Sequence, residues 1–176
     1  MRNKKDRFKK CQMTDRGEKM EIVLDRIERK DKDICYRLLQ YSLFEESISD
    51  FNEMNEEALF EYEGFDDYFT NGDASAYFIR EKETEKIVGF IMVNTQMQQF
   101  ETGHCIAEFM VIPKYRRNKI GKAAAAECFD LFKGNWEVSP SYGSEKAYLF
   151  WKRVIDDYTD QNNTFEQGRF MFTNSK

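Results

Sequence analysis

The sequence has few of the residues on which several common kinds of active site depend. It contains one histidine, so a histidine-based catalytic triad or a zinc site has little to build on. Its four cysteines are scattered without a CxxC pair, and no complete GxGxxG or P-loop motif is present. No apolar run approaches the ~20 residues that span a bilayer, and the basic N-terminus lacks the apolar core of a signal peptide. These absences predict a cytoplasmic protein with reduced thiols, no metal site and no membrane association.

The residues that are present are sufficient for one folded domain. Of 176 residues, 41% are hydrophobic and 15% are aromatic, which supports a hydrophobic core. The net charge of -5 argues against a general nucleic-acid-binding protein. Residues 1–19 differ from the rest, with eight Lys/Arg against three Asp/Glu, and we predict a flexible basic extension there. The domain itself is expected to span residues 20–176.

Hydrophobic periodicity predicts a mixed order of strands and helices. Strands are expected at 20–27, at 74–97 as a hairpin turning at 82–86, centrally at 104–113, at 136–138, and as a last pair around a polar loop at 160–164. Helices are expected at 30–41, at 120–132 before Gly134, and from an N-cap at Ser144 to about Ile155. The order predicts an α/β fold with a mostly antiparallel sheet of six or seven strands, one parallel crossover and about four helices on both faces.

The span 38–79 has an unusual composition. It contains eleven Asp/Glu and no Lys or Arg, and aromatic residues are interleaved with the acidic ones. One interpretation is a solvated acidic face over an aromatic core, built from short helical pieces that break near Gly64 and at Asn71–Gly72. The other is a wall that attracts a cationic substrate.

The stretch 108–126, EFMVIPKYRRNKIGKAAAA, predicts an anion-binding site. A buried strand leads through a turn at Pro113 and a basic loop into a helix that starts near Ile120. The first-turn amides of a helix have no partner within the helix, and the helix dipole adds partial positive charge there. Formal positive charge gathers at the same point, from Arg116, Arg117, Lys119 and Lys122. The loop is hypothesised to bind the pyrophosphate of a nucleotide-like cofactor, with an exposed basic turn as the alternative.

Two stretches together resemble the GNAT superfamily of acyl-CoA N-acyltransferases. YRRNKIGKA, after a strand and before an alanine-rich helix, is similar to the family's pyrophosphate loop, Arg/Gln-x-x-Gly-x-Gly/Ala, with Lys119 in place of the first glycine. GNWEVSPSYGSEKAYLFWKRVI is similar to the family's next strand and helix. The usual Asn-x-x-Ala-x-x-Phe-Tyr signature is here Ser144-x-x-Ala147-x-x-Phe150-Trp151.

The resemblance covers about residues 20–173 and implies a reaction and a set of binding residues. The reaction is transfer of an acetyl group from acetyl-CoA to a primary amine by direct attack, without a metal. Backbone amides of the central strand would polarise the thioester carbonyl and hold the pantetheine arm, while the basic loop takes the pyrophosphate. The implied cofactor-binding residues are Met110, Val111, Ile112, Arg116, Arg117, Asn118, Lys119, Ile120, Gly121, Lys122, Ala123, Ser144 and Trp151.

Glu108 is the candidate general base, because it is the one carboxylate in an apolar strand and burial raises the pKa of a carboxyl. In regular alternation it shares a face with Ile106, Met110 and Ile112. The alternative is a structural carboxylate satisfied by a buried hydrogen bond or an arginine.

The general acid is harder to assign, since Trp151 stands where the family often has a tyrosine. Tyr148, one helical turn before Trp151, is the candidate, and Tyr142 is the next nearest tyrosine. A packing role for Tyr148, with solvent as the proton donor, is the alternative. His104 is interpreted as an edge residue or a substrate contact.

The acidic span lies where the family builds its acceptor wall, which implies a cationic amine. A polyamine, an aminoglycoside-like drug, a lysine side chain or an N-terminus would fit, and a homodimer is compatible with the sequence. Two other functions stay open: a non-catalytic acyl-CoA-binding module of the same fold, supported by Trp151, and an unrelated α/β nucleotide-binding protein, weakened by the missing GxGxxG.

Overall fold

The chain forms one seven-stranded sheet in the computed structural model, which describes residues 20–49, 51–70 and 72–174. The strands are β1 (Ile22–Arg26), β2 (Ser75–Glu81), β3 (Ile87–Asn94), β4 (His104–Val111), β5 (Gly134–Val138), β6 (Thr164–Glu166) and β7 (Arg169–Asn174). Their order across the sheet is β1-β2-β3-β4-β5-β7-β6, and only β4 and β5 run parallel. The predicted α/β fold with a mostly antiparallel sheet and a parallel crossover is confirmed.

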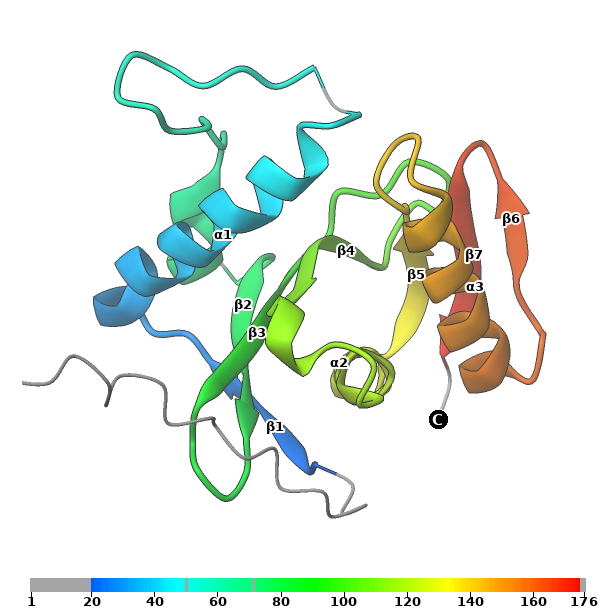
Figure 1. Ribbon diagram of the computed structural model, residues 1–176. Coiled ribbons are helices and arrows are strands. Elements are labelled where there is room, and N and C mark those ends of the chain that lie inside the picture. The colour runs from blue at the N-terminus through cyan, green and yellow to red at the C-terminus, as the bar shows by residue number, and fades with distance from the viewer. Residues whose placement is uncertain (1–19, 50, 71, 175–176) are drawn as a thin grey trace, which may run out of the picture.

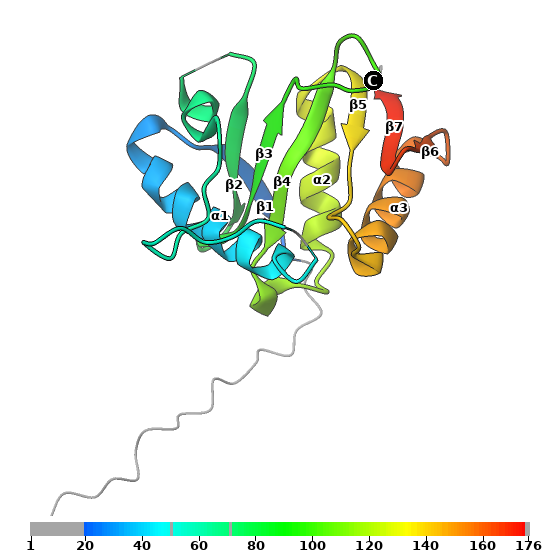
Figure 2. The same cartoon turned by 90° about the horizontal axis from the view of Figure 1, so that it is seen from above.

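Helices cover both faces of the sheet (Figures 1 and 2). Helix α1 (Lys32–Glu46) lies on one face, and α2 (Ile120–Leu131) and α3 (Glu145–Thr159) lie on the other. Short 3-10 turns are present at Arg29–Asp31, Phe65–Phe69 and Pro113–Tyr115. Within the described ranges there are thus three α-helices instead of the four expected. The N-terminal extension predicted for residues 1–19 lies outside the described residues.

Each face of the sheet has its own hydrophobic core. The core under α2 and α3 includes Phe129 and Trp136, which have no exposed surface. The core under α1 includes Leu39 and Phe90, which are equally buried. Because β4 lies in the middle of the sheet, its alternating side chains contribute to both cores.

Helix α1 is longer than predicted, and the acidic segment after it is less helical. The helix ends at Glu46 rather than Tyr41, and between it and β2 the described residues form one 3-10 turn and an isolated bridge between Met54 and Phe60. The side-chain amide of Gln40 explains this extended path. Its Nε2 donates to the Phe60 carbonyl at 3.0 Å, and its Oε1 accepts from the Phe60 amide at 2.8 Å. Gln40 therefore pairs with the backbone of the segment as a neighbouring strand would.

Two predicted boundaries near the C-terminus are wrong. Gly134, expected to end α2, is the first residue of β5, because the chain already turns extended at Phe132. Residues 160–163 join α3 to β6, whereas the hairpin of β6 and β7 turns at Gln167–Gly168, both of which have positive φ. Ser144 does cap α3 as predicted, since its Oγ accepts from the Ala147 amide at 3.2 Å.

Strand β4 has a bulge. Side chains before the bulge point to the face of the sheet opposite to the one that regular alternation predicts. Met92 of β3 pairs with Glu108 and Val93 pairs with Ile106, so one residue of β4 between them has no partner. Ile106 consequently packs under α2 and α3, while Met110 packs under α1. The expectation that Ile106 shares a face with Glu108 and Met110 is therefore wrong.

Strand β4 also parts from β5. Only residues 104–106 of β4 pair with β5, through Trp136, Glu137 and Val138. Beyond Ile106 the two strands separate (Figure 2), and residues 107–111 have no strand on that side. We refer to residues 107–111 as the open edge of β4.

Candidate active site

The open edge of β4 exposes backbone groups that the sheet leaves unpaired. The Ile112 amide donates to the Val88 carbonyl of β3 at 2.8 Å. Because successive residues of an antiparallel strand point their amides to opposite sides, Met110 also faces β3, and Phe109 and Val111 face the open edge. Of the three amides predicted to bind the cofactor, those of Met110 and Ile112 thus point the wrong way. Phe109 was not predicted, because only the register identifies it.

The basic loop ends in a helix N-terminus with unsatisfied amides. In α2 the first backbone bond runs from the Ala123 amide to the Lys119 carbonyl, at 3.0 Å. The amides of residues 120–122 precede that bond and have no partner in the preceding helical turn. The prediction for Ala123 is therefore corrected: its amide is occupied by the helix.

Lys119 adopts the left-handed conformation that the usual glycine would take. Its φ is +61° and it occupies the N-cap of α2, and Arg117 has a φ of +69°. Each non-glycine residue in this region costs about 1–2 kcal/mol. Lys119 thus holds a left-handed conformation that favours glycine, and it adds a positive charge beside the amides of the first turn. Asn118, between these two residues, is exposed.

Gly121 lets an aromatic ring approach the start of α2. A Cβ at this position would lie 3.1 Å from two ring atoms of Phe150 in α3. Phe150 in turn contacts Phe109 of the open edge, with ring centroids 5.6 Å apart, and Trp151 contacts Phe109 at 5.0 Å. The first turn of α2 and the open edge are therefore joined by a continuous aromatic surface.

Arg116 and Arg117 have different environments, although both were predicted to bind the pyrophosphate. The Arg116 Nε donates to the Val111 carbonyl at 2.7 Å, and its Nη2 donates to both carboxylate oxygens of Glu45, at 2.7 and 3.0 Å. Arg117 is exposed and forms no ion pair within the described part of the chain. The structure therefore gives Arg116 a role in fixing the loop, and leaves Arg117 available to an anion. Lys122 is paired with Asp157 of α3 at 2.6 Å.

The end of α1 bridges the two sides of the strand separation. Glu45 binds Arg116, on the β4 side, as described above. Its neighbour Glu46 accepts from the Ser141 Oγ at 2.8 Å, in the segment between β5 and α3. Two carboxylates of the acidic span thus lie at the opening between β4 and β5. Sequence spacing cannot find these contacts, since the partners are 71 and 95 residues apart.

Glu108 is buried on the α1 side of the sheet. Its residue is 8% exposed, and the side chains that sense its charge are Cys35 of α1, Tyr62 and Tyr68. Burial first, and the Glu108 charge second, raise the pKa of Cys35 to about 12, so this thiol stays protonated. The same two causes raise the pKa of Tyr62, whose hydroxyl lies near Glu108 and Tyr68. Neither tyrosine was predicted as a functional residue.

Tyr148, the candidate general acid, lies at the β6–β7 edge of the sheet. The Tyr148 ring stacks on Phe170 at 5.6 Å and contacts Phe165 at 5.0 Å, so it packs on β6 and β7. Tyr142 is 75% exposed, and Trp151 is a core residue. His104 packs against Phe132 and Trp136 at the paired end of β4, where burial lowers the pKa of its imidazole. The packing role of Tyr148 is therefore the one the geometry favours.

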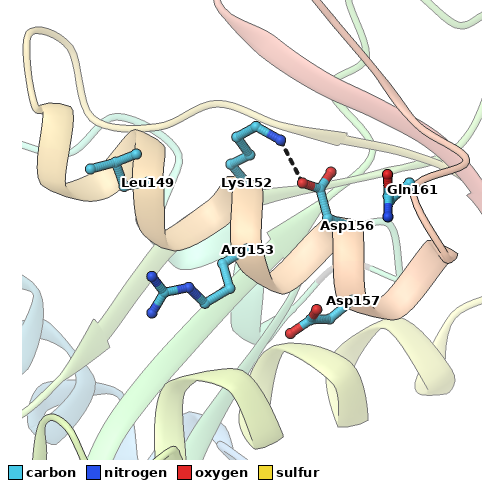
Figure 3. A pocket seen from close by; sticks show the side chains of 6 residues that line it. All are labelled: Leu149, Lys152, Arg153, Asp156, Asp157 and Gln161. Atoms are coloured by element: carbon cyan, nitrogen blue, oxygen red, sulfur yellow. Dashed lines mark hydrogen bonds and ion pairs between the residues drawn. The ribbon is translucent and has the colours of Figure 1, made fainter.

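A surface cavity of about 350 Å³ lies along α3, away from the site, and is lined by Leu149, Lys152, Arg153, Asp156, Asp157 and Gln161 (Figure 3). Another cavity has a volume of about 230 Å³, and its carboxylates come from Glu61, Glu63, Asp67 and Asp73. Tyr62, Tyr68 and Asn94 line this second cavity as well. We call it the acidic cavity.

Glu137 anchors the loop between β3 and β4, part of which lines the acidic cavity. The residue is 1% exposed, and its carboxylate accepts from the backbone amides of residues 98, 99 and 100 at 2.7–3.2 Å. Arg169 of β7 donates to it at 3.0 Å. Earlier in the same loop, Thr95 and Gln96 line the cavity. Sequence reasoning missed Glu137, which its pattern marks only as part of a short strand.

Two kinds of feature are absent from the described ranges. No group of three or more His, Cys, Asp or Glu side chains there is arranged to hold a metal ion. No helix in those ranges is long and apolar enough to cross a membrane.

Residues 40–153 match the model of the acetyltransferase (GNAT) family. No curated protein sequence matches the chain. Among solved structures, an acetyltransferase from Thermus thermophilus is similar at a TM-score of 0.61, with 12% identity, 88% of this chain and 98% of that chain covered. The aminoglycoside 6'-N-acetyltransferase AAC(6')-Ih from Acinetobacter baumannii has a TM-score of 0.55, with 9% identity over 84% and 92%. Arabidopsis thaliana NAA60 has a TM-score of 0.54, with 13% identity over 88% and 99%.

Proposed function

Because the chain belongs to the acetyltransferase (GNAT) family and is therefore an acyltransferase, we propose that it transfers the acetyl group of acetyl-CoA to a primary amine by direct attack. The observation that supports this most is the meeting of the open edge of β4 with the uncapped start of α2. The open edge of β4 supplies amides for an extended arm and for a carbonyl. The start of α2 supplies amides and nearby cations for a diphosphate. In this proposal residues 20–176 form a single N-acetyltransferase domain.

Acetyl-CoA fits the donor groups that the structure leaves available. Amides of residues 120–122, with the side chains of Arg117, Asn118 and Lys119, would hold its pyrophosphate. The amides of Phe109 and Val111 would hold the pantetheine arm and polarise the thioester carbonyl. Trp151 and Phe150 would border the reacting group as an apolar surface. Ser144 contributes indirectly, by capping α3.

Glu108 would remove the proton from the attacking amine. It projects from the strand whose open edge receives the thioester, and it is the buried carboxylate of that strand. Holding the two reactants beside each other supplies much of the acceleration, because no covalent intermediate with the protein is needed. Since Tyr148 packs away on β6 and β7, we assign protonation of the leaving thiolate to solvent.

The acceptor is proposed to be a cationic amine. Glu46 lies at the opening between β4 and β5, and four more carboxylates line the acidic cavity. Such a field raises the local concentration of cations. The named acceptor of one structural neighbour, an aminoglycoside antibiotic, is compatible with this class.

Turnover of acetyl-CoA with a panel of amines tests the function. Release of CoA thiol is expected with polyamines, aminoglycosides or lysine-containing peptides, and weaker release with anionic amino acids. A preference for the anionic amino acids would contradict the charge argument. Binding of CoA without turnover of any amine would instead favour the non-catalytic acyl-CoA-binding module, which Trp151 and the packed Tyr148 make the second candidate.

Arg117→Ala is expected to weaken acetyl-CoA binding by about 10–100-fold, the loss of one charge-assisted contact to phosphate. Isothermal titration with CoA measures the dissociation constant directly. Lys114→Ala is the matched control, because Lys114 is an exposed cation of the preceding turn that lies over Tyr115 at 5.4 Å. Equal effects of the two substitutions would indicate general electrostatics and would contradict a specific phosphate contact.

A further inference from the structure

A chain of polar side chains leads from Glu108 to the acidic cavity. The Tyr62 hydroxyl lies close enough to Glu108 and to Tyr68 for both to act on its pKa, and the two tyrosine rings meet edge to face with centroids 6.5 Å apart. Asn94 continues the chain, since its Nδ2 donates to the Tyr68 hydroxyl oxygen at 2.7 Å. Tyr62, Tyr68 and Asn94 line the acidic cavity, and Glu108 does not. The buried carboxylate is thus connected to the surface by hydroxyl groups.

A general base in this position needs such a connection. It gains one proton from the acceptor in every turnover and must release it before the next. Glu108 is 8% exposed, so direct release to bulk solvent is restricted. Cys35 also faces it, but burial and the Glu108 charge keep that thiol protonated, with its pKa raised to about 12.

We propose that Tyr62 and Tyr68 relay the acceptor's proton from Glu108 to the acidic cavity. The proposal rests on the proposed function, in which Glu108 is the base. It goes beyond that function by giving roles to two tyrosines of the irregular segment and to a cavity outside the acetyl-CoA site.

The relay moves one proton in two stages. While Glu108 is ionised it can only accept, so Tyr62 donates to it and accepts from Tyr68. An N–H bond of the amine then breaks, and its proton joins the Glu108 carboxylate while the nitrogen bonds to the acetyl carbon. The C–S bond of the thioester breaks, and the leaving CoA thiolate takes a proton from solvent. The new Glu108 O–H donates to the Tyr62 oxygen, and the Tyr62 proton passes to Tyr68.

In the second stage the proton leaves the relay. Tyr68 releases its own proton to water or to a carboxylate of the acidic cavity, and the hydroxyls turn back toward Glu108. Asn94 donates throughout to the Tyr68 oxygen and so fixes it at the cavity wall. Each tyrosine ends with the one proton with which it began. Burial first, and the Glu108 charge next, raise the pKa of Tyr62, which keeps it a neutral hydroxyl between turnovers.

Steady-state kinetics of Tyr62→Phe tests the relay, because this variant keeps the ring and removes the hydroxyl. We expect kcat to fall about tenfold or more. This loss should be smaller than the 10²–10⁴-fold loss that follows removal of a general base. The KM for acetyl-CoA should not change, and the solvent isotope effect on kcat should rise, because proton release becomes limiting. Tyr68→Phe should act in the same direction and serves in its place if Tyr62→Phe does not fold.

The double variant and a matched control separate a relay from packing. Tyr62→Phe/Tyr68→Phe should have the kcat of Tyr62→Phe alone, since breaking a chain twice has no further effect. Tyr36→Phe is the control, because its hydroxyl donates to the Phe60 carbonyl at 3.1 Å and its ring packs on Phe65 at 5.1 Å. It should leave kcat and the isotope effect unchanged.

The relay and the proposed function fail in different ways. If Glu108→Gln is inactive while Tyr62→Phe and Tyr68→Phe keep the wild-type kcat and isotope effect, the relay is overturned. The assignment of Glu108 as the general base is then retained. Additive losses in the double variant, together with an equal loss in Tyr36→Phe, also overturn it in favour of packing. If Glu108→Gln keeps full activity, or the wild type acetylates no amine, the proposed function itself fails and the relay with it.

Discussion

Glu108→Gln is expected to lower kcat for amine acetylation by about 10²–10⁴-fold, the usual contribution of a positioned general base. Glutamine keeps the shape of the side chain and can still accept a hydrogen bond from Tyr62, so the fold and the hydrogen-bonded chain should survive. It cannot take a proton. Isothermal titration should show unchanged affinity for CoA, because the residue points to the α1 side of the sheet and the proposed acetyl-CoA contacts come from the backbone of the open edge and from α2.

Glu127→Gln is the matched control for this substitution. Glu127 is a half-buried carboxyl of α2 whose pKa is raised, chiefly by burial, but it does not lie on β4. Its replacement should leave kcat unchanged. The acidic limb of the wild-type pH–rate profile should disappear in Glu108→Gln and persist in Glu127→Gln. A Glu108→Gln enzyme with wild-type kcat at every pH would make Glu108 a structural carboxylate.

The parts of the site that depend on neighbouring residues were predictable, and the parts that depend on register were not. A strand, a basic loop and a helix start follow one another within residues 108–126, so their meeting is a local property of the chain. The bulge before Glu108 is not local, because it is defined by how β3 and β4 align. It changes which side Ile106 faces, and so the simple alternation rule fails there.

Long-range contacts decide which of two similar residues is available to bind phosphate. Arg116 and Arg117 are adjacent and equally charged, and only the position of Glu45, 71 residues away from Arg116, distinguishes them. Likewise Tyr62 sits in an irregular segment without periodicity. Gln40 holds that segment against α1 through both backbone groups of Phe60. The acidic composition of the span was visible in the sequence, whereas its division between the β4–β5 opening and the acidic cavity was not.

The two charged anchors of the site differ in what they stabilise. Glu45 and Arg116 are partly exposed, with side chains 46% and 29% exposed, so solvent screens much of their attraction. Their value lies in fixing the loop that precedes α2. Glu137 and Arg169 are 1% and 16% exposed. This second pair should therefore contribute to the stability of the whole fold.

Glu137→Gln is expected to reduce the free energy of unfolding by about 3–5 kcal/mol, the cost of removing one partner of a buried ion pair. Arg169 would keep a buried charge without its carboxylate, and its Nε already lacks a hydrogen-bond partner among the described residues. The glutamine NH₂ would also face backbone amides of residues 98–100, which are donors themselves. Urea unfolding followed by circular dichroism measures the change. Asp25→Asn is the control, because the Asp25–Arg80 pair is 50% and 29% exposed and should be worth about 0–1 kcal/mol.

The loss of unfolding free energy in Glu137→Gln should become smaller as the pH falls. Burial alone would raise the pKa of the Glu137 carboxyl, but the amides of residues 100, 99 and 98 and then Arg169 outweigh it and hold the pKa below its usual value of 4.5. A carboxyl with a lowered folded-state pKa stabilises the fold above its unfolded-state pKa, and this contribution is lost as pH falls through the folded-state value. The difference between wild type and Glu137→Gln should thus be full at about pH 6 and shrink below about pH 4.5. A difference that stays constant over that range would show that Glu137 stabilises the loop by packing, without a contribution from its charge.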